Sequence, residues 1–452
     1  MKKTFIVILS FLFSFNLLAQ KQLTLEKAIQ IALQKNPNLI KGKNLLEANR
    51  TSIKSAYGNL LPNLNASAGW NWNRIDDPGG KKQIDFFGNE IITKPTQIDT
   101  RSYSVSAGGN ITLFDGLANY ARISQAENKF ESAKFSLSKL KRDIVFTTTQ
   151  LYYSVIATKE LVKVREENSK YNEKLLEQIK ERNKLGSVPA ADVYTQQVAV
   201  GNAQLLLIQS QNSYETALNN FLDFLALDIF QNYQLVNPYE EPENIKNIIN
   251  ENFLSEYSTI EDLVKVAIEN REDYKSKRLE LEIAESGKTI ANSGYFPRLS
   301  GNYGFSTSGT SVNSLFERKN YNVGLTLSFP IFSNWNTEES SQLAKINYLN
   351  QEVELFELER KIKIQVKESF LNLVAAKKKL EVTQVNVKAA KENRKVNSER
   401  YNLGSGTILD VFQSDRNYTQ ALTDLITSKF EYLENRDKLL NAIGKLDYEN
   451  YK

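Results

Sequence analysis

The sequence predicts a mainly α-helical, internally duplicated protein in which long coiled-coil helices lead to four β-strands of a membrane β-barrel. Three observations support this fold class. Short motifs recur far apart along the chain, and four segments alternate strictly between apolar and polar residues. In addition, residues 117–184 and 335–402 contain neither Pro nor Gly. Alternation with period two is typical of strands, whereas long uninterrupted runs of three-four spacing are typical of helices.

The N-terminus has the layout of a secretory signal peptide, expected over residues 1–19. Lys2 and Lys3 precede an apolar run from Phe5 to Leu18, and Ala19 offers a small residue for cleavage. An uncleaved anchor is the alternative, but the run is shorter than the ~20 residues that a spanning helix needs. No later run could be a spanning helix, because charges interrupt every one. We therefore expect an exported protein that enters a membrane only by strands.

The composition excludes several function classes. The chain has no Cys and no His, which rules out disulfides, a lipobox cysteine, His- or Cys-based metal sites and Ser–His nucleophile pairs. Carboxylates are plentiful but form no distinctive constellation, so neither an enzyme nor a cofactor is expected. The net charge is +4 with both signs mixed along the chain, which argues against a nucleic-acid partner.

The chain is a duplicated half, because matching motifs recur in the same order. "ERNKLGSVPAADVY" (181–194) resembles "ERYNLGSGTILDVF" (399–412), and "AYGNLLPNLNASAGW" (56–70) resembles "ANSGYFPRLSGNYGF" (291–305). The separation between matching residues shrinks after Tyr103. The first half therefore carries an insertion, which is rich in Pro, Gly and Lys and is expected to form a long exposed loop over 74–99. The predicted organisation is a first repeat (20–228), a linker (229–257), a second repeat (258–445) and a short tail (446–452).

The four alternating segments predict the strands, each with one apolar and one polar face. They are expected at about 63–73, 101–114, 298–308 and 320–332. The polar face is small and uncharged and aromatic residues gather near the ends, which favours a membrane barrel. A soluble sandwich remains the alternative. Because the smallest membrane barrels have about eight strands, a barrel must be shared between chains as a dimer, trimer or tetramer.

The Pro- and Gly-free runs predict two long helices, from Gly116 to Lys184 and from Asn334 to Asn402. Apolar residues in the first follow a coiled-coil seam, and each helix would span roughly 100 Å at 1.5 Å per residue. Shorter helices are expected at about 189–227 and 407–443.

The turn between each long helix and the shorter one contains "LGS", at Leu185–Ser187 and Leu403–Ser405. Gly is the usual residue just past a helix end, because it tolerates positive φ. Asp192 and Asp410 then fall in the first turn of the next helix, where a carboxylate interacts favourably with the helix dipole. These local roles account for the motif without any chemistry.

Together, the signal peptide, the two repeats of helix, strand, strand and helix pair, "LFDG" and "FPIF" at strand-to-helix junctions, and the doubled "LG…D" turn resemble the TolC family of bacterial outer-membrane efflux proteins. The likeness covers nearly the whole mature chain. It implies a homotrimer with a twelve-stranded barrel in the lipid of a Gram-negative outer membrane and an α-helical barrel across the periplasm. It also implies the exit duct of a tripartite efflux pump or type I secretion system, with a periplasmic adaptor protein and an inner-membrane transporter of the RND or ABC type as partners.

The resemblance makes the two turns the periplasmic tips, where a gate and the adaptor contact would lie. The residues carried over are Asp192, Asp410, Tyr401, Gly186, Ser187, Gly404, Ser405 and Gly406. Gly406 stands where well-known members have an arginine, and Gln413 stands at a further aspartate position, so an ionic lock of that form is not expected. Rings of Asp192 or Asp410 would favour cations.

A second hypothesis is a non-conducting coiled-coil protein with a structural or adhesive role at the outer membrane. It explains the long helices, whereas the strand alternation and the unequal helix lengths favour the channel. The sequence does not name the exported substrate.

Overall fold

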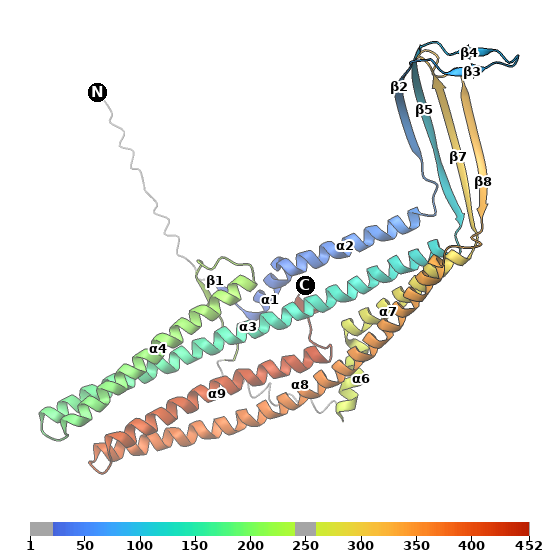
Figure 1. The fold of residues 1–452 in the computed structure, drawn as a ribbon. Helices are drawn as coiled ribbons and strands as arrows, with labels where there is room; N and C mark the ends of the chain where they lie inside the picture. The colour runs from blue at the N-terminus through green and yellow to red at the C-terminus, as the bar shows by residue number, and fades with distance from the viewer. Residues whose placement is uncertain (1–20, 240–258, 452) are drawn as a thin grey trace, which may run out of the picture. The chain divides into compact units, whose positions relative to one another are not determined.

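The computed structural model describes residues 21–239 and 259–451 (Figure 1). The expected signal peptide and most of the linker after Tyr239 lie outside the described residues. The elements are β1 (Lys21–Leu23), α1 (Leu25–Lys35), α2 (Pro37–Gly58), β2 (Asn65–Asp77), β3 (Lys82–Ile84), β4 (Glu90–Ile92), β5 (Thr96–Phe114), α3 (Ala118–Lys184), α4 (Ala190–Phe224), β6 (Tyr233–Leu235), α6 (Ile260–Asn270), α7 (Glu272–Asn292), η2 (Ser293–Tyr295), β7 (Arg298–Gly309), β8 (Lys319–Ser328), α8 (Asn336–Asn402), α9 (Ile408–Ala442) and η3 (Glu449–Tyr451).

The predicted duplication is confirmed, because the main helices and strands recur in the same order in the two halves, and most of the helices recur at the same length. The long helices α3 and α8 have 67 residues each, and the following helices α4 and α9 have 35 each. The short helices α1 and α6 have 11 residues each. Thr24 and Thr259 cap these two short helices with the same side-chain hydrogen bond to the backbone. The fold class is therefore mainly helical with a small strand region, as expected.

The chain divides into two compact units, and the long helices contribute to both. The helical unit comprises the described residues 21–43, 136–239, 259–273 and 358–451, and the sheet unit comprises residues 44–135 and 274–357. Among the described residues, no helix is long and apolar enough to cross a membrane.

In the sheet unit, four strands form one antiparallel sheet in the order β2-β5-β7-β8. The register places apolar residues opposite one another on one face: Trp70 opposite Tyr103, and Leu299 opposite Leu327. No second sheet covers this face in the described chain, since Val323 and Leu325 are 89% and 72% exposed. The soluble sandwich is therefore wrong for the described residues, because it would bury these side chains.

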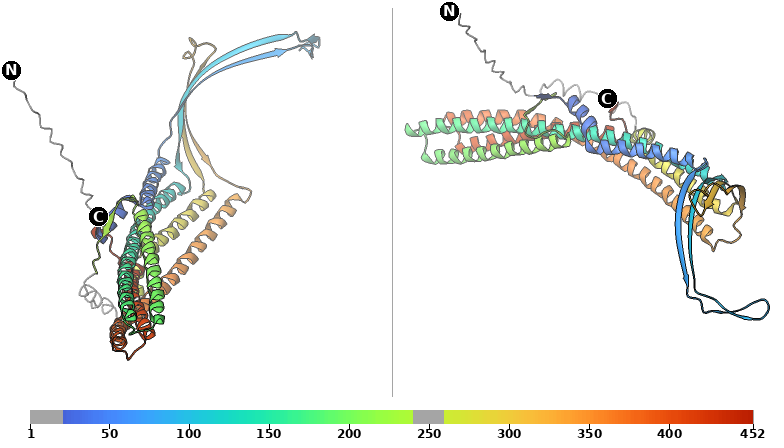
Figure 2. Two further views of the ribbon diagram at one scale, coloured as in Figure 1. Left: turned by 90° about the vertical axis from the view of Figure 1, so that its left-hand side faces the viewer. Right: turned by 90° about the horizontal axis from the view of Figure 1, so that it is seen from above.

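Residues 74–99, expected to form a long exposed loop, are mostly exposed, but the structure corrects the loop itself because strands extend through most of the segment. β2 runs on to Asp77 and β5 begins at Thr96, with Ile75 paired to Ile98. Figure 2 shows these two strands extending beyond β7 and β8, with the β3–β4 hairpin at their ends. The Asp85 carboxylate accepts hydrogen bonds from the backbone N–H groups of Phe87 and Asn89 at 2.9 and 2.8 Å, which closes the hairpin turn.

The end of β8 and the start of the linker also differ from the expected structure. β8 ends at Ser328 rather than at 332, because Pro330 cannot donate to the ladder. The linker, expected to be irregular, contains β6, which pairs in parallel with β1. Leu23 and Leu235 of this pair are each 2% exposed, and the Tyr152 hydroxyl of α3 donates to the carbonyl oxygen of Val236. Apolar burial and this hydrogen bond hold the linker start against the helix.

A buried carboxyl in the helical unit makes stability depend on pH. Asp437 of α9 is 6% exposed and accepts a hydrogen bond from the Tyr153 hydroxyl at 3.1 Å. Burial raises the pKa of Asp437 to about 6, while the Arg436 charge and the Tyr153 hydrogen bond act in the opposite direction. The unfolded chain has the ordinary aspartate pKa near 3.9. The folded state therefore holds the proton more tightly, and stability is lost as pH rises from about 4 through about 6.

We expect Asp437→Asn to raise the free energy of unfolding at pH 8 by up to about 3 kcal/mol, because it removes the buried charge and keeps an acceptor for Tyr153. At pH 4 the variant and the parent should be equally stable. Thermal unfolding followed by circular dichroism at both pH values checks this. Asp223→Asn, at an exposed position on α4, is the matched control. A parent protein whose stability does not change between pH 4 and 8 contradicts the prediction.

Candidate functional site

The site is built on the two turns that join α3 to α4 and α8 to α9 in the helical unit. Gly186 and Gly404 have φ values of +71° and +74°, which confirms the expected helix ends. The Ser187 N–H donates to the Arg182 carbonyl at 2.8 Å, and the Ser405 N–H donates to the Arg400 carbonyl at 2.9 Å. These bonds satisfy carbonyl groups that the helix itself leaves unpaired. The two turns therefore have the same backbone.

The helices that follow the turns begin differently in the two repeats. Thr407 and Asp410 form a capping box, in which the Asp410 carboxylate accepts the Thr407 N–H at 3.1 Å and the Thr407 hydroxyl at 2.8 Å. The backbone hydrogen bond from Thr407 is the main reason why the pKa of Asp410 is lowered. In the first repeat, Pro189 stands at the cap and provides no side-chain hydrogen bond. Asp192 is thus available for another partner.

That partner is Tyr401, which lies at the end of α8 and therefore in the other repeat. The Tyr401 hydroxyl donates to Asp192 Oδ2 at 2.9 Å, across 209 residues of sequence. Burial, followed by the charge and hydrogen bond of Asp192, raises the pKa of Tyr401 to about 12. The hydroxyl therefore keeps its proton at neutral pH and remains a donor. The Arg182 guanidinium lies 5.0 Å from the centre of the Tyr401 ring, a cation–π distance.

An apolar cluster that includes Tyr401 joins the two helical hairpins beside this hydrogen bond. Its buried members come from α3, the first turn, α8 and α9, and they are Leu175, Ile179, Val188, Tyr401, Ile408 and Val411. Tyr171 and Val193 pack against the cluster and are half-buried. Because the hydrogen bond is bordered by apolar side chains, breaking it costs more than the same bond would in water.

The remaining predicted residues lie near this pair without joining it. Ser187 and Ser405 are exposed at the turns, and Asp410 is exposed in its capping box. A Cβ atom at Gly406 would lie 3.1 Å from Arg400 Cβ and from the Tyr401 backbone nitrogen. A side chain at Gly406 would therefore need the end of α8 to shift. The guanidinium beside Tyr401 comes instead from Arg182.

A polar layer farther along the helices was missed by the sequence reasoning. Asp415 of α9 forms an ion pair with Arg394 of α8 at 3.1 Å and accepts hydrogen bonds from Asn168 and Asn172 of α3 at 2.8 and 3.0 Å. The Arg394 guanidinium lies 4.6 and 4.2 Å from the ring centres of Tyr171 and Tyr418. The available signal was the loss of apolar seam residues in this part of α3. The layer links the two hairpins a second time.

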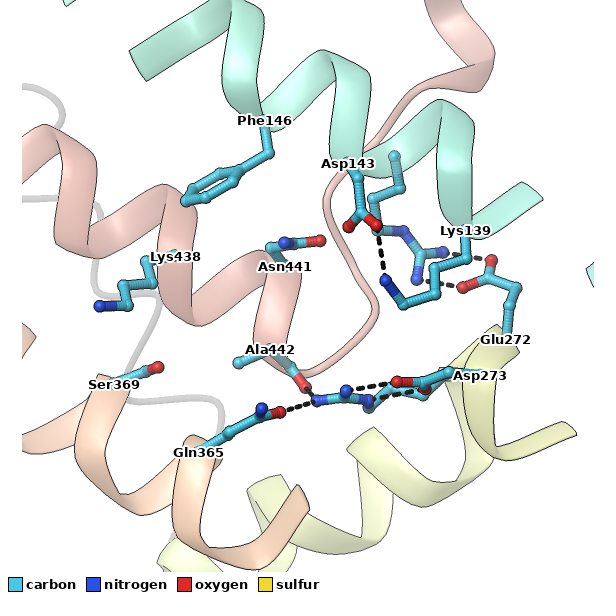
Figure 3. Close-up of a pocket in the computed structure, with 12 residues that line it drawn as sticks. Lys139, Asp143, Phe146, Glu272, Asp273, Gln365, Ser369, Lys438, Asn441 and Ala442 are labelled. Atoms are coloured by element: carbon cyan, nitrogen blue, oxygen red, sulfur yellow. Dashed lines mark hydrogen bonds and ion pairs between the residues drawn. The ribbon is translucent and has the colours of Figure 1, made fainter. Parts of the chain in front are cut away.

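A charged cavity of about 280 Å³ lies elsewhere in the helical unit (Figure 3). Arg142 and Glu272 form a bidentate ion pair there, as do Arg271 and Asp273. The third acid on the wall, Asp143, pairs with the Lys139 ammonium at 2.5 Å, so every acid that lines the cavity has a cationic partner. Across the described ranges, no three His, Cys, Asp or Glu residues are grouped so that they could hold a metal ion.

Comparison with known proteins gives a consistent result. The model of the outer membrane efflux protein family matches residues 28–225 and 263–445. Outer membrane protein TolC of Vibrio cholerae serotype O1 is 22% identical over 429 residues, which cover 93% of this chain and 90% of that protein. Pyoverdine export outer membrane protein OpmQ of Pseudomonas aeruginosa is 22% identical over 93% of this chain and 85% of that protein. The Campylobacter jejuni CmeC outer membrane channel superposes with a TM-score of 0.76 at 16% identity, over 93% of this chain and 85% of that one.

Proposed function

The chain belongs to the outer membrane efflux protein family and is an outer-membrane efflux channel, and we propose that three copies form the exit duct of a tripartite efflux pump or type I secretion system. The match to the family model over both repeats carries this proposal. The chain resides in the outer membrane of a Gram-negative bacterium. Its partners are a periplasmic adaptor and an inner-membrane transporter of the RND or ABC type. The channel function is not enzymatic.

The sheet supports assembly of the barrel from three chains. β2 and β8 are the edges of the four-stranded sheet, and each is paired on one side only within the described chain. When β8 of one copy pairs with β2 of the next, twelve strands close and no edge is left unpaired. The exposed apolar face then meets lipid, and the face rich in Ser, Asn and Gly lines water. This arrangement explains why Val323 and Leu325 are uncovered in a single chain.

The turns support a gate at the periplasmic end. The Tyr401–Asp192 hydrogen bond and the apolar cluster hold the two hairpins of one chain together. Opening requires these hairpins to separate, so an adaptor opens the channel by binding the separated state more tightly. Exposed Asp410 and half-buried Asp192 would recur in every copy around the entrance, and these acidic rings favour cations.

The experiment that tests the function is reconstitution of the purified protein in planar bilayers, together with its oligomer mass. A trimer with discrete conductance steps supports the duct. A non-conducting oligomer would favour the structural or adhesive alternative, which no observation here favours.

We expect the double variant Asp192→Ala/Asp410→Ala to lower the preference of the channel for cations, because two acidic rings are removed. The loss should be several-fold in the cation-to-anion permeability ratio, because a unit charge in water at about 7 Å changes the local concentration of a monovalent ion by about threefold. Asp424→Ala, at an exposed position of α9 farther from the turn, is the matched control. Unchanged conductance and selectivity in the double variant would remove these acids from the gate.

A further inference from the structure

The polar face of the sheet is almost free of charge, and one of its two charged residues in the described strands lies where the strands meet the helices. Where all four strands β2, β5, β7 and β8 lie side by side, the residues on this face are Asn, Ser, Thr and Gly, apart from Arg298. Arg298 begins β7 on the same face, opposite Ser328. In the described strands, the only other charged residue of this alternation is Asp77, at the far end of β2. Arg298 therefore determines the charge of the face at its helix-proximal end.

The Arg298 guanidinium has no acidic partner. It donates one hydrogen bond, to Thr112 Oγ1 at 3.3 Å, and no carboxylate of the described residues forms an ion pair with it. Arg122 of α3 lies nearby in the same cavity but is compensated, because it contacts the Asp115 carboxylate at 3.2 Å and Asn119 Oδ1 at 2.8 Å. One guanidinium of the pair is thus neutralised by the protein, and the other is left for a solute.

Both guanidinium groups line a polar cavity of about 570 Å³ in the sheet unit. The other polar groups on its wall include Asn63, Asn110, Thr112 and Ser328, which are neutral. With Asp115 compensating one arginine, the cavity has one positive charge more than it has negative charges. An arginine fork matches carboxylate and phosphate groups in geometry as well as in charge.

We propose that three copies of Arg298 form a cationic ring in the channel lumen, at the helix-proximal end of the strands, that favours anionic solutes such as carboxylates and phosphate esters. This inference rests on the proposed trimeric channel. Rings of Arg or Lys select anions in pores because the fixed charge acts on every ion that passes. A unit charge in water at about 7 Å changes the local concentration of a monovalent ion by about threefold. The neutral wall around Arg298 leaves this preference unopposed at that level of the lumen.

The acidic rings at the turns act in the opposite sense, so the effect of Arg298 is measured as a difference between variants. We expect Arg298→Ala to lower the anion-to-cation permeability ratio by at least about threefold, from reversal potentials in a potassium chloride gradient. Arg298→Lys should keep the parent ratio, and Arg298→Glu should shift it further toward cations. Lys319→Ala, on the apolar parity of the neighbouring strand β8, removes the same charge from the other face and should leave the ratio unchanged.

The outcomes separate this inference from the proposed function. If the parent protein conducts and Arg298→Ala has the parent permeability ratio, the ring is wrong and the channel stands. If the parent protein does not conduct, both the channel and the ring are wrong. Arg298→Gln provides the same comparison should the alanine variant fail to insert, because it keeps a polar side chain of similar length without the charge. Block of the parent channel by millimolar citrate, relieved in Arg298→Gln, would support the preference for carboxylates.

Discussion

Replacing Tyr401 by phenylalanine is expected to raise the ratio of open to closed channel by about tenfold for each copy that opens. The substitution removes the hydrogen bond to Asp192 Oδ2 and keeps the ring in the apolar cluster. A hydrogen bond to a charged group is worth about 1.5–3 kcal/mol, and 1.4 kcal/mol corresponds to a factor of ten. If three copies open together, the factors multiply. The measurement is the open probability of single channels in planar bilayers at pH 7.

Two further variants show whether the hydrogen bond is responsible. Tyr194→Phe makes the same chemical change two residues after Asp192, at a side chain that is 67% exposed, and should leave the open probability unchanged. Asp192→Asn keeps an oxygen acceptor and removes the charge, so its effect should be smaller than that of Tyr401→Phe. If Tyr401→Phe behaves like Tyr194→Phe, the hydrogen bond does not hold the channel closed.

Replacing Arg142 by alanine is expected to lower the free energy of unfolding of the helical unit by about 3–5 kcal/mol. Arg142 and Glu272 are each 8% exposed, and the guanidinium donates to both carboxylate oxygens, one of them at 2.6 Å. Removing the arginine leaves a buried carboxylate without its cation, which costs far more than the pair itself contributes. Thermal unfolding followed by circular dichroism provides the measurement.

The controls for Arg142 distinguish burial from the mere presence of an ion pair. Lys134→Ala breaks the exposed pair between Lys134 and Glu131, whose side chains are 46% and 47% exposed, and should cost less than about 1 kcal/mol. The double variant Arg142→Met/Glu272→Met should recover most of the stability, because no unpaired charge remains. A cost for Arg142→Ala similar to that for Lys134→Ala would contradict the argument.

Much of the fold could be predicted from the sequence because its signals are local. Gly186 and Gly404 end the long helices, and strict alternation marks β7 and β8. The β3–β4 hairpin was missed because its insertion looked irregular in composition, whereas the Asp85 side chain closes a tight turn. The pairing of β6 with β1 was missed because it joins short segments far apart in sequence.

Less of the candidate site than of the fold could be predicted from the sequence. The position of Asp410 in the first turn of α9 was expected from the sequence, and the structure adds its capping box with Thr407. The contact of Tyr401 with Asp192 has no local signal, and only the family resemblance brought these two residues together. The Arg394–Asp415 pair lies on helices where charges usually face water, so nothing in the spacing distinguished it from a solvated pair. Such contacts depend on how two hairpins pack, which periodicity does not encode.

The equal lengths of the repeated helices restrict how the protein can change in size. α3 and α8 have 67 residues each, and α4 and α9 have 35 each. Deleting one heptad from α3 alone would draw its turn back by about 10 Å relative to that of α8. Tyr401 would then lose its hydrogen bond to Asp192, and the two turns would no longer end at the same level. We therefore expect insertions and deletions to be tolerated only when α3, α4, α8 and α9 all change by the same length.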